Sequence, residues 1–325
     1  MQVHYNIDQL PAFRNAVITI GTFDGVHLGH RQILNSLKEE AEKIKGETVI
    51  ITFHPHPRKI VAGSKSPILL INTLAEKIEL LEAAGINHLV VTPFTEAFSI
   101  QSAEEYVANF LIAKFNPHTV IIGYDHRFGK DRKGDYLLLE QLAIPYKYRL
   151  KEIPKHLLNE ISISSTNIRN AILKENIDTA NKLLGYDFFF EGEVVHGDKL
   201  GRTLGYPTAN LVVKDDQKIV PGDGIYAVYG ELLNTEAIAA NEMTYIPHRT
   251  SYTRLKGMMS IGFRPTVGGT KHVIEVNLFD FNEDIYGKTL RIYVKNYLRP
   301  EIKFNSLEAL VKQIDQDKTD SLKIL

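Results

Sequence analysis

The chain has 325 residues, and this length favours two domains of roughly 150 residues each. Hydrophobic residues make up 44% of the chain and charged residues 24%, as in a typical globular protein, and the formal net charge of -1 argues against an overall electrostatic attraction to nucleic acid or a membrane surface. The chain has no cysteine, which excludes disulfides, thiolate metal sites and a cysteine nucleophile.

The amino-terminal segment, MQVHYNIDQLPAF, lacks the basic region and the long apolar run of a signal peptide. No apolar run further along approaches the ~20 residues that a transmembrane helix needs. We therefore expect a cytoplasmic protein whose partners are small molecules, not nucleic acid or a membrane.

The first half of the chain alternates strand-like and helix-like segments. Short apolar runs predict strands, and apolar residues spaced three or four apart predict helices. The predicted strands cover 16–20, 48–53, 88–91 and 119–122, and the predicted helices cover 29–45, 74–84 and 103–114. This alternation indicates an α/β domain with a parallel sheet covered on both faces. In such a sheet, ligands bind at the carboxyl ends of the strands.

The second half changes character after about residue 185. A helix is predicted over 165–184, and strand-like segments then follow one another between turns that contain glycine and proline. These strands are predicted over 188–195, 224–232, 257–262, 272–279 and 289–294, and a helix over 306–313. The pattern predicts an all-β sandwich or barrel with a terminal helix. We therefore expect one domain over 1–185 and another over 186–325.

The stretch GTFDGVHLGH joins the first predicted long helix to the strand before it. Gly21, Gly25 and Gly29 allow the backbone to approach a ligand closely, and a helix amino terminus attracts phosphate. Imidazoles at His27 and His30 can donate hydrogen bonds to phosphoryl oxygens as charge builds up in a transition state. From these residues alone, a glycine-rich turn with structural histidines is an equally good interpretation.

GTFDGVHLGH resembles the signature of enzymes that join the adenylyl group of ATP to a phosphate acceptor, and above all the adenylyltransferase module of bacterial bifunctional riboflavin kinase/FAD synthetases. IIGYDHRFGKDRKGD (121–135) resembles that module's flavin- and nucleotide-binding loop, although His126 stands where many relatives carry an aromatic residue. ISSTNIR (163–169) resembles its second ATP-binding motif. The resemblance implies a Rossmann-like nucleotidyltransferase domain whose ligands contact Gly21, Phe23, Asp24, Gly25, Asp125, Ser164, Thr166 and Arg169, with His27 and His30 catalytic.

Simpler interpretations of two of these stretches remain open. Taken alone, Ser165 or Thr166 serves equally well as a helix N-cap, and Arg169 as a surface charge. In TFHPHPRKI (52–60), His54 and His56 alternate as two metal ligands would, but prolines interrupt the strand and no third ligand follows at a recognisable spacing. The resemblance implies instead a loop at the flavin end of the site, with Arg58 contacting the FMN phosphate.

HGDKLGRTLGYPTANL (196–211) is the most distinctive stretch of the second half. The hydroxyl of Thr208 and the amide oxygen of Asn210, two residues apart, can face one hard cation such as Mg²⁺. A plain turn before a strand is an equally good interpretation of P-T-A-N alone. Together with the upstream G-D-x-x-G-R, however, the stretch resembles the hallmark of flavokinases. That resemblance implies a Greek-key barrel with Gly201 at the nucleotide and Thr208 and Asn210 at Mg²⁺.

Later segments follow the order of the flavokinase family: GIYAV, SIGFRPTVGG, HVIEVNLFDFN and YLRPEIKFNSLEAL. Alternation in the third segment predicts Glu275 as a solvated strand residue, whereas the resemblance makes it the general base for the riboflavin 5′-hydroxyl. Arg299 either contacts the ligand or pairs with Glu301. The linker between GIYAV and SIGFRPT, which includes 241–257, is longer than in the family pattern. It is either a plain surface loop, the interpretation that we favour, or a basic patch formed by His248, Arg249, Arg254 and Lys256.

The resemblance covers nearly the whole chain and implies two reactions: ATP phosphorylates riboflavin to FMN, and a second ATP then adenylylates FMN to FAD with release of pyrophosphate. Two alternatives remain. The first half could use a different phosphorylated acceptor, or one half could be inactive and serve as a flavin-binding or regulatory module. The intact His27, His30, Thr208, Asn210 and Glu275 argue against inactivity.

Overall fold

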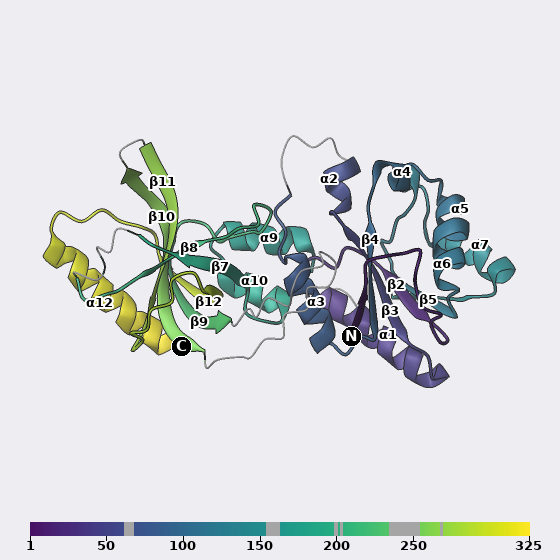
Figure 1. Ribbon diagram of the computed structural model, residues 1–325, viewed down its shortest axis with the longest axis horizontal. Helices are drawn as coiled ribbons and strands as arrows, with labels where there is room; N and C mark the ends of the chain where they lie inside the picture. The colour runs from purple at the N-terminus through teal and green to yellow at the C-terminus, as the bar shows by residue number, and fades with distance from the viewer. Residues whose placement is uncertain (62–67, 154–162, 198–200, 202–203, 234–253, 267–268) are drawn as a thin grey trace. The chain divides into compact units, whose positions relative to one another are not determined.

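The computed structural model describes residues 1–61, 68–153, 163–197, 201, 204–233, 254–266 and 269–325. The chain forms two compact units, Met1–Ser164 and Ser165–Leu325, each of which is described here by itself (Figure 1). In the described part of the chain, no helix combines the length and apolar character that crossing a membrane requires.

The first unit is built on a sheet whose strands are all parallel, in the order β1-β4-β3-β2-β5-β6. These strands are β1 (Gln2–His4), β2 (Val17–Ile20), β3 (Thr48–His54), β4 (His88–Pro93), β5 (Thr119–Gly123) and β6 (Arg149–Ile153). The connecting elements are α1 (Leu28–Ile44), α2 (Pro57–Val61), α3 (Leu74–Ala83), α4 (Glu96–Ser99), α5 (Ala103–Glu105), the π-helix η1 (Tyr106–Ile112), α6 (Ala113–Phe115), the 3-10 helix η2 (Lys130–Arg132) and α7 (Tyr136–Tyr146).

Both faces of this sheet are buried, as the apolar strands predict. Ile18 and Ile51 point into a core shared with Val107 and Leu111 of η1, whereas Ile50 on the other face packs in a core with residues of α1 and α3. Because successive strand residues face opposite sides, strands buried on both faces must be apolar throughout. The predicted parallel α/β domain is therefore confirmed. Strands β1 and β6 and helix α7 were not predicted, and the middle of the expected helix 103–114 is a π-helix.

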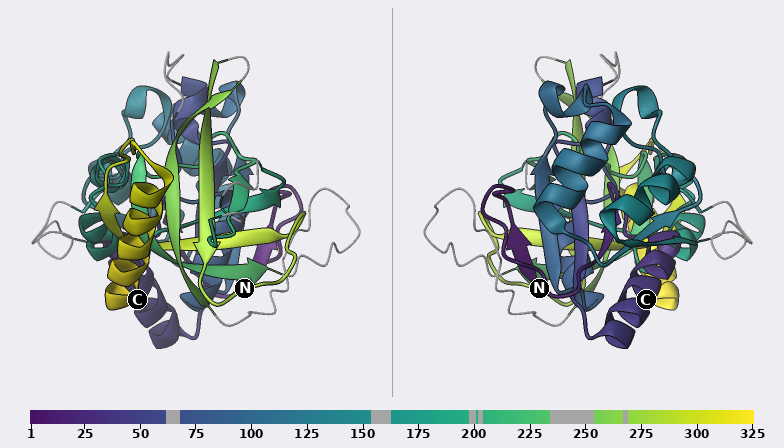
Figure 2. Two further views of the ribbon diagram at one scale, coloured as in Figure 1. Left: turned by 90° about the vertical axis from the view of Figure 1, so that its left-hand side faces the viewer. Right: turned by 90° about the vertical axis from the view of Figure 1, so that its right-hand side faces the viewer.

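The second unit is a closed barrel with the strand order β10-β11-β8-β7-β12-β9 and antiparallel neighbours. Its strands are β7 (Phe189–Val195), β8 (Ala209–Val212), β9 (Gly224–Leu233), β10 (Leu255–Thr266), β11 (Gly269–Leu278) and β12 (Thr289–Arg299). Helix α12 (Leu307–Ile324) lies against β9, β10 and β12 (Figure 2). The predicted barrel with a terminal helix is confirmed, and the helix extends well past its expected end.

Two helices, α9 (Ser165–Leu173) and α10 (Ile177–Leu184), stand where one helix over 165–184 was expected. The prediction is wrong because Glu175 adopts a left-handed backbone, φ 55°, and the side chain of Asn176 then caps the new helix.

Both helices belong to the second unit. The side chain of Asn181 donates to the Val294 carbonyl at 2.9 Å and accepts from the Phe188 amide at 2.7 Å, which ties α10 to β12 and to the start of β7. The compact units thus divide after Ser164, earlier than the change of pattern near residue 185.

Candidate active sites

The turn between β2 and α1 carries GTFDGVHLGH and has an unusual backbone. Phe23, Gly25 and Val26 all have positive φ, at 47°, 91° and 35°. Such a conformation strains a residue with a side chain, and it persists only where the surroundings enforce it. The side chains of Phe23 and Val26 are 2% and 1% exposed, so burial of apolar surface offsets the strain. The turn therefore presents the residues after it from a fixed position.

His27 is the N-cap of α1, and its Nδ1 accepts a hydrogen bond from the backbone amide of His30 at 3.3 Å. A ring nitrogen that accepts carries no proton, so the neutral His27 ring has its proton on Nε2. The cap thereby selects the tautomer in which Nε2 is a donor. This is the form that a hydrogen bond to a phosphoryl oxygen requires.

His30 is held uncharged by its surroundings. Its ring stacks on that of His27 with centroids 3.6 Å apart and lies 4.9 Å from the ring of Phe23. Burial lowers the pKa of His30 well below its usual value, and the nearby His27 and Lys77 lower it further. Near neutral pH, His30 can therefore act on a ligand through hydrogen bonds, not through a fixed imidazolium charge.

Asp24 and Lys77 lie buried beside this turn. Oδ1 of Asp24, which is 1% exposed, accepts from the backbone amides of Ile71 at 2.9 Å and Asn72 at 3.2 Å. Lys77 of α3 is 7% exposed, and its Nζ donates to the Thr22 carbonyl at 2.6 Å. The structure thus gives Asp24 a part in holding the turn, and its ligand contact stays a prediction. Lys77 was not predicted.

The other residues predicted for this site follow the carboxyl ends of neighbouring strands. In the sheet, β2 lies between β3 and β5. The turn follows β2, Arg58 in α2 follows β3, and Asp125 follows β5. Because carboxyl ends of parallel strands meet at one edge of the sheet, the topology brings these segments together.

The remaining expectations for the first site are not tested by its geometry. Thr166 and Arg169 lie in α9, which belongs to the second unit, so their ATP contacts stay predictions. Burial lowers the pKa of His126 to about 4, more strongly than Asp125 raises it. Among the described residues, no three His, Cys, Asp or Glu side chains are grouped as a metal site would need, so His54 and His56 have no third ligand there.

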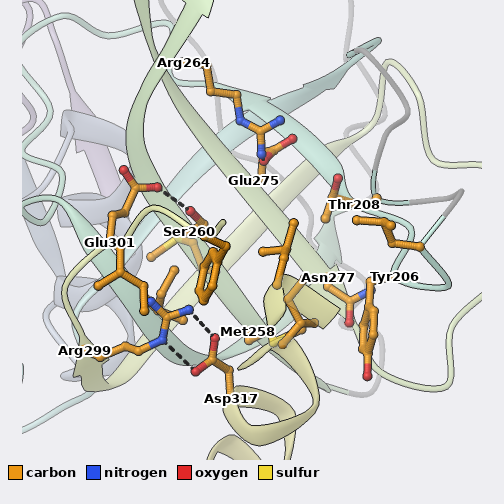
Figure 3. Close-up of a pocket in the computed structure, with 18 residues that line it drawn as sticks. Tyr206, Thr208, Met258, Ser260, Arg264, Glu275, Asn277, Arg299, Glu301 and Asp317 are labelled. Carbon is orange, nitrogen blue, oxygen red and sulfur yellow. Dashed lines mark hydrogen bonds and ion pairs between the residues drawn. The ribbon is translucent and has the colours of Figure 1, made fainter. Parts of the chain in front are cut away.

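The barrel carries a pocket bounded by β10, β11, the segment before β8, the segment after β12, and α12 (Figure 3). Its lining combines apolar walls with polar side chains from several elements. The labelled residues are Tyr206, Thr208, Met258, Ser260, Arg264, Glu275, Asn277, Arg299, Glu301 and Asp317. This composition is typical of a small-molecule site.

Glu275 lies in this pocket and is only 8% exposed. The alternation of β11 is as predicted, but the outward face is covered by the pocket walls, so the interpretation of Glu275 as a solvated residue is wrong. Its carboxylate forms an ion pair with Arg264 of β10 (Figure 3). Glu275 is paired across the sheet with Asn210 of β8.

Asn210 and Glu275 share one face of the β8–β11 pair, since directly opposed residues point to the same side of a sheet. Thr208 immediately precedes β8 and lines the pocket together with Glu275. Two glycines are packed against this group: a Cβ on Gly201 would lie 3.2 Å from Oγ1 of Thr208, and one on Gly197 would lie 2.2 Å from Nδ2 of Asn210. The hydroxyl, amide and carboxylate oxygens are ligands of the kind that Mg²⁺ prefers, so these residues fit the predicted metal.

Arg299 closes the other end of the pocket. Its Nε and Nη2 donate to the two carboxylate oxygens of Asp317 at 2.8 and 2.6 Å, and Gln313 donates to Asp317 Oδ1 at 2.9 Å. Glu301 instead accepts from Ser260 at 3.1 Å, so of the two alternatives for Arg299 the pair with Glu301 is not formed. Asp317 was missed because it lies in α12 beyond the predicted helix end.

Replacing Asp317 should destabilise the barrel. Asp317→Ala leaves Arg299, whose side chain is 18% exposed, without its bidentate partner. Loss of one member of such a buried pair costs about 3 kcal/mol of unfolding free energy. Urea denaturation of the full chain measures the change. Asp320→Ala, which removes an exposed carboxylate from the same helix, should cost less than about 1 kcal/mol; an equal loss in both variants would contradict the importance of the Arg299 pair.

Part of the distinctive loop and the long insertion lie outside the described residues. These are 198–200, 202–203 and 234–253, which include the basic His248 and Arg249. At the edge of the insertion, the guanidinium of Arg254 lies 3.8 Å over the ring of Tyr293. The question of a basic patch therefore stays open.

Comparisons with known proteins assign both units. A family model described as FAD synthetase matches residues 10–167, and one described as riboflavin kinase matches residues 184–325. The bifunctional riboflavin kinase/FMN adenylyltransferase of Escherichia coli (strain K12) is 34% identical over 314 residues, which cover 97% of this chain and 94% of that one. The protein of the same name from Bacillus subtilis (strain 168) is 35% identical over 312 residues, with 95% and 92% covered.

A crystal structure described as a macrolide-efflux protein from Streptococcus pneumoniae is also similar, with a TM-score of 0.82, 31% identity and 98% of each chain covered. The similarity therefore extends over both units in sequence and in fold. Because curated relatives match over nearly its whole length and both family models match in order, the chain belongs to the family of bifunctional riboflavin kinase/FMN adenylyltransferases.

Proposed function

We propose that the second unit transfers the γ-phosphate of ATP to the 5′-hydroxyl of riboflavin, giving FMN and ADP, and that the first unit joins FMN to the adenylyl group of ATP, giving FAD and pyrophosphate. The two matching families and the names of the full-length relatives support this assignment. The structural observation that carries it is Glu275, which lines a pocket with Thr208 and lies opposite Asn210, in a unit separate from the stacked His27 and His30.

In the kinase reaction, Glu275 accepts the proton of the riboflavin 5′-hydroxyl as that oxygen attacks the γ-phosphorus. Thr208 and Asn210 hold Mg²⁺ through their side-chain oxygens, and the bound ion would offset the negative charge of the ATP phosphates. Gly201 packs closely against Tyr206 and Thr208, and we assign it to the nucleotide on the family resemblance. Arg299, fixed by Asp317, contacts the ligand from the opposite end of the pocket.

In the adenylylation reaction, a phosphate oxygen of FMN attacks the α-phosphorus of ATP and pyrophosphate leaves. A phosphate monoester whose second pKa is about 6 is already a nucleophile at neutral pH, so this unit needs no strong base. His27 donates from Nε2 to a phosphoryl oxygen, and the uncharged His30 beside it acts in the same way. Both rings stabilise charge in the transition state.

Other residues of the proposed adenylyltransferase region, 1–185, would hold the substrates. Gly21, Phe23 and Gly25 shape the turn around the phosphates, and Ser164, Thr166 and Arg169 contact ATP, as the similarity of ISSTNIR to the second ATP motif implies. Asp24 supports the turn from inside. At the flavin end, Arg58 contacts the FMN phosphate. Asp125, in the segment that resembles the flavin- and nucleotide-binding loop, contacts the bound substrate.

The sequence pattern supports an adenylyltransferase domain over 1–185 and a kinase domain over 186–325 as functional regions, with α9 and α10 packed on the barrel. Since both reactions consume ATP, a cytoplasmic location remains part of the proposal. The substrates are ATP, riboflavin and FMN, and the metal is Mg²⁺.

An assay with riboflavin and Mg-ATP tests the whole assignment. Chromatography should show FMN first and FAD later, and FMN with Mg-ATP alone should give FAD and pyrophosphate. Other phosphate esters offered in place of FMN should give no adenylylated product, which separates FMN from a different acceptor. If neither FMN nor FAD forms, the proposal that the chain catalyses these two reactions is wrong. If only one reaction takes place, the unit proposed for the other is inactive.

A further inference from the structure

Lys77 is a buried charged residue that the proposed mechanism does not use. It projects from α3, where Leu74, Ile78 and Leu81 also face inward, and only 7% of its surface is exposed. Its Nζ donates at 2.6 Å to the carbonyl of Thr22, the second residue of GTFDGVHLGH. Oγ1 of Thr52 in β3 donates to the same oxygen at 3.3 Å. A lysine on an apolar helix face thus reaches the turn that carries the histidines.

The strained turn is held at two successive points. Lys77 fixes the carbonyl of Thr22, immediately before the left-handed Phe23, and Asp24 on the other side of Phe23 is bound by the amides of Ile71 and Asn72. A backbone in this conformation needs such anchors, because it is unfavourable by itself. Displacing either anchor would therefore change the position from which α1 presents His27.

We propose that Lys77, as an ammonium ion, is a positioning residue for adenylyl transfer: it anchors the turn before His27 and places a positive charge near His30. This inference rests on the proposed role of the first unit in FAD formation. Lys77 acts through the turn and through His30, and touches no reacting atom. The kinase reaction of the second unit does not depend on it.

The electrostatic surroundings of Lys77 support this role. Burial lowers its pKa from the usual 10.5 to about 8, and the carboxylate of Asp24 opposes that shift. Its positive charge in turn lowers the pKa of His30. Among the described residues, two groups interact electrostatically with Lys77: the carboxylate of Asp24 in the turn and the ring of His30 in α1. Thr52 of β3 contributes a hydroxyl, which binds the same carbonyl oxygen.

Deprotonation of Lys77 should reduce adenylyl transfer without unfolding the protein. Above pH 8 the neutral amine loses its charge-assisted bond to Thr22 and its attraction to Asp24. Between pH 8 and 10.5, however, the unfolded chain still binds this proton while the folded chain has released it, so this group makes the fold more stable as pH rises. A fall in activity in that range would therefore report the anchor, not loss of the fold.

The first test uses the full-length wild-type protein. Initial rates of FAD formation from FMN and Mg-ATP should fall above about pH 8 toward a plateau roughly tenfold lower, the level expected for an uncharged side chain at this position. Rates of FMN formation from riboflavin, measured in the same samples, should not show this limb. Wild-type protein that forms FAD with no alkaline limb near pH 8 would overturn the inference while leaving the proposed function intact; protein that forms no FAD at any pH would refute the proposed function itself.

Substitutions then assign the limb to Lys77. Lys77→Arg keeps the charge and should move the limb above pH 10. Lys77→Met should lower kcat for FAD formation by roughly tenfold, leave the KM for FMN nearly unchanged and abolish the limb, since a positioning defect acts on the transition state. Lys43→Met, at an exposed position of α1, is the matched control and should behave as wild type.

NMR titration of His30 gives a readout separate from activity. In Lys77→Met the pKa of His30 should rise, because the positive charge that lowers it has gone. An unchanged His30 pKa in the folded variant, or an alkaline limb that stays near pH 8 in Lys77→Arg, would contradict the proposal. If Lys77→Met does not fold, the wild-type profile and Lys77→Arg decide the question.

Discussion

His27→Ala should lower FAD formation by about 10²–10³-fold and leave FMN formation close to the wild-type rate. The size follows from the loss of one preorganised hydrogen-bond donor to the charge that develops on the phosphoryl oxygens. FMN formation should survive because the proposed base and metal ligands lie on the barrel, in the other compact unit. Separate assays, one with FMN and Mg-ATP and one with riboflavin and Mg-ATP, measure the two rates.

His27→Asn separates catalysis from capping. Asparagine is a good N-cap, so its side-chain oxygen can accept from the His30 amide as Nδ1 of His27 does, but it has no donor where Nε2 lies. We expect this variant to match the wild type in thermal stability and His27→Ala in its loss of FAD formation. Full FAD formation by the folded His27→Asn protein would show that His27 serves only as a cap.

Glu275→Gln should lower FMN formation from riboflavin by about 10²–10⁴-fold, the range expected when a general base is removed. The amide has the shape of the carboxylate but cannot take the proton of the 5′-hydroxyl. FAD formation from supplied FMN should remain near the wild-type rate, since the residues proposed for it lie in the region 1–185 and do not include Glu275. In the two assays used for His27, this variant should therefore lose FMN formation and keep FAD formation, the reverse of His27→Ala.

Glu283→Gln, in an exposed loop after β11, is the control for Glu275 and should leave both rates unchanged. Because Glu275 also pairs with Arg264, its loss could disturb the pocket, so the thermal unfolding of Glu275→Gln must be compared with the wild type. A folded Glu275→Gln that keeps its kinase rate would remove Glu275 from the mechanism. If either His27→Asn or Glu275→Gln stopped both reactions, the two sites would not be independent.

The sequence predicted the fold well where apolar periodicity was unambiguous. The run 49–51 consists of three consecutive apolar residues because both faces of β3 are buried, and this pattern correctly identified a central parallel strand. Strand β1 was missed because Gln2–His4 is short and polar. The break between α9 and α10 was missed because Glu175 adopts a left-handed conformation that its residue type does not favour.

The sequence predicted the motifs of the candidate sites, but not the residues that hold those motifs in place. Glycines and histidines clustered between a strand and a helix point to a phosphate site, and the structure places them in one rigid turn. Lys77 and Asp317 could not be assigned from local pattern, because their partners Thr22 and Arg299 lie far along the chain. The sequence does carry a signal for Lys77: it is a cationic residue at a position of its helix where leucines and an isoleucine face inward, which indicates a buried charge.

The packing of α9 on the barrel unit bears on how the gene can be divided. Ile168 and Ile172 of this helix are completely buried, and α10 is bonded to β12, so an expression fragment for the barrel should start at residue 165. The complementary fragment, ending at residue 164, would then lack Thr166 and Arg169, which the family resemblance assigns to ATP. A fragment meant to measure adenylylation should therefore extend past Arg169, because a cut after residue 164 removes residues that the resemblance assigns to ATP. Kinetic values from the shorter fragment would understate the adenylylation capacity of the intact chain.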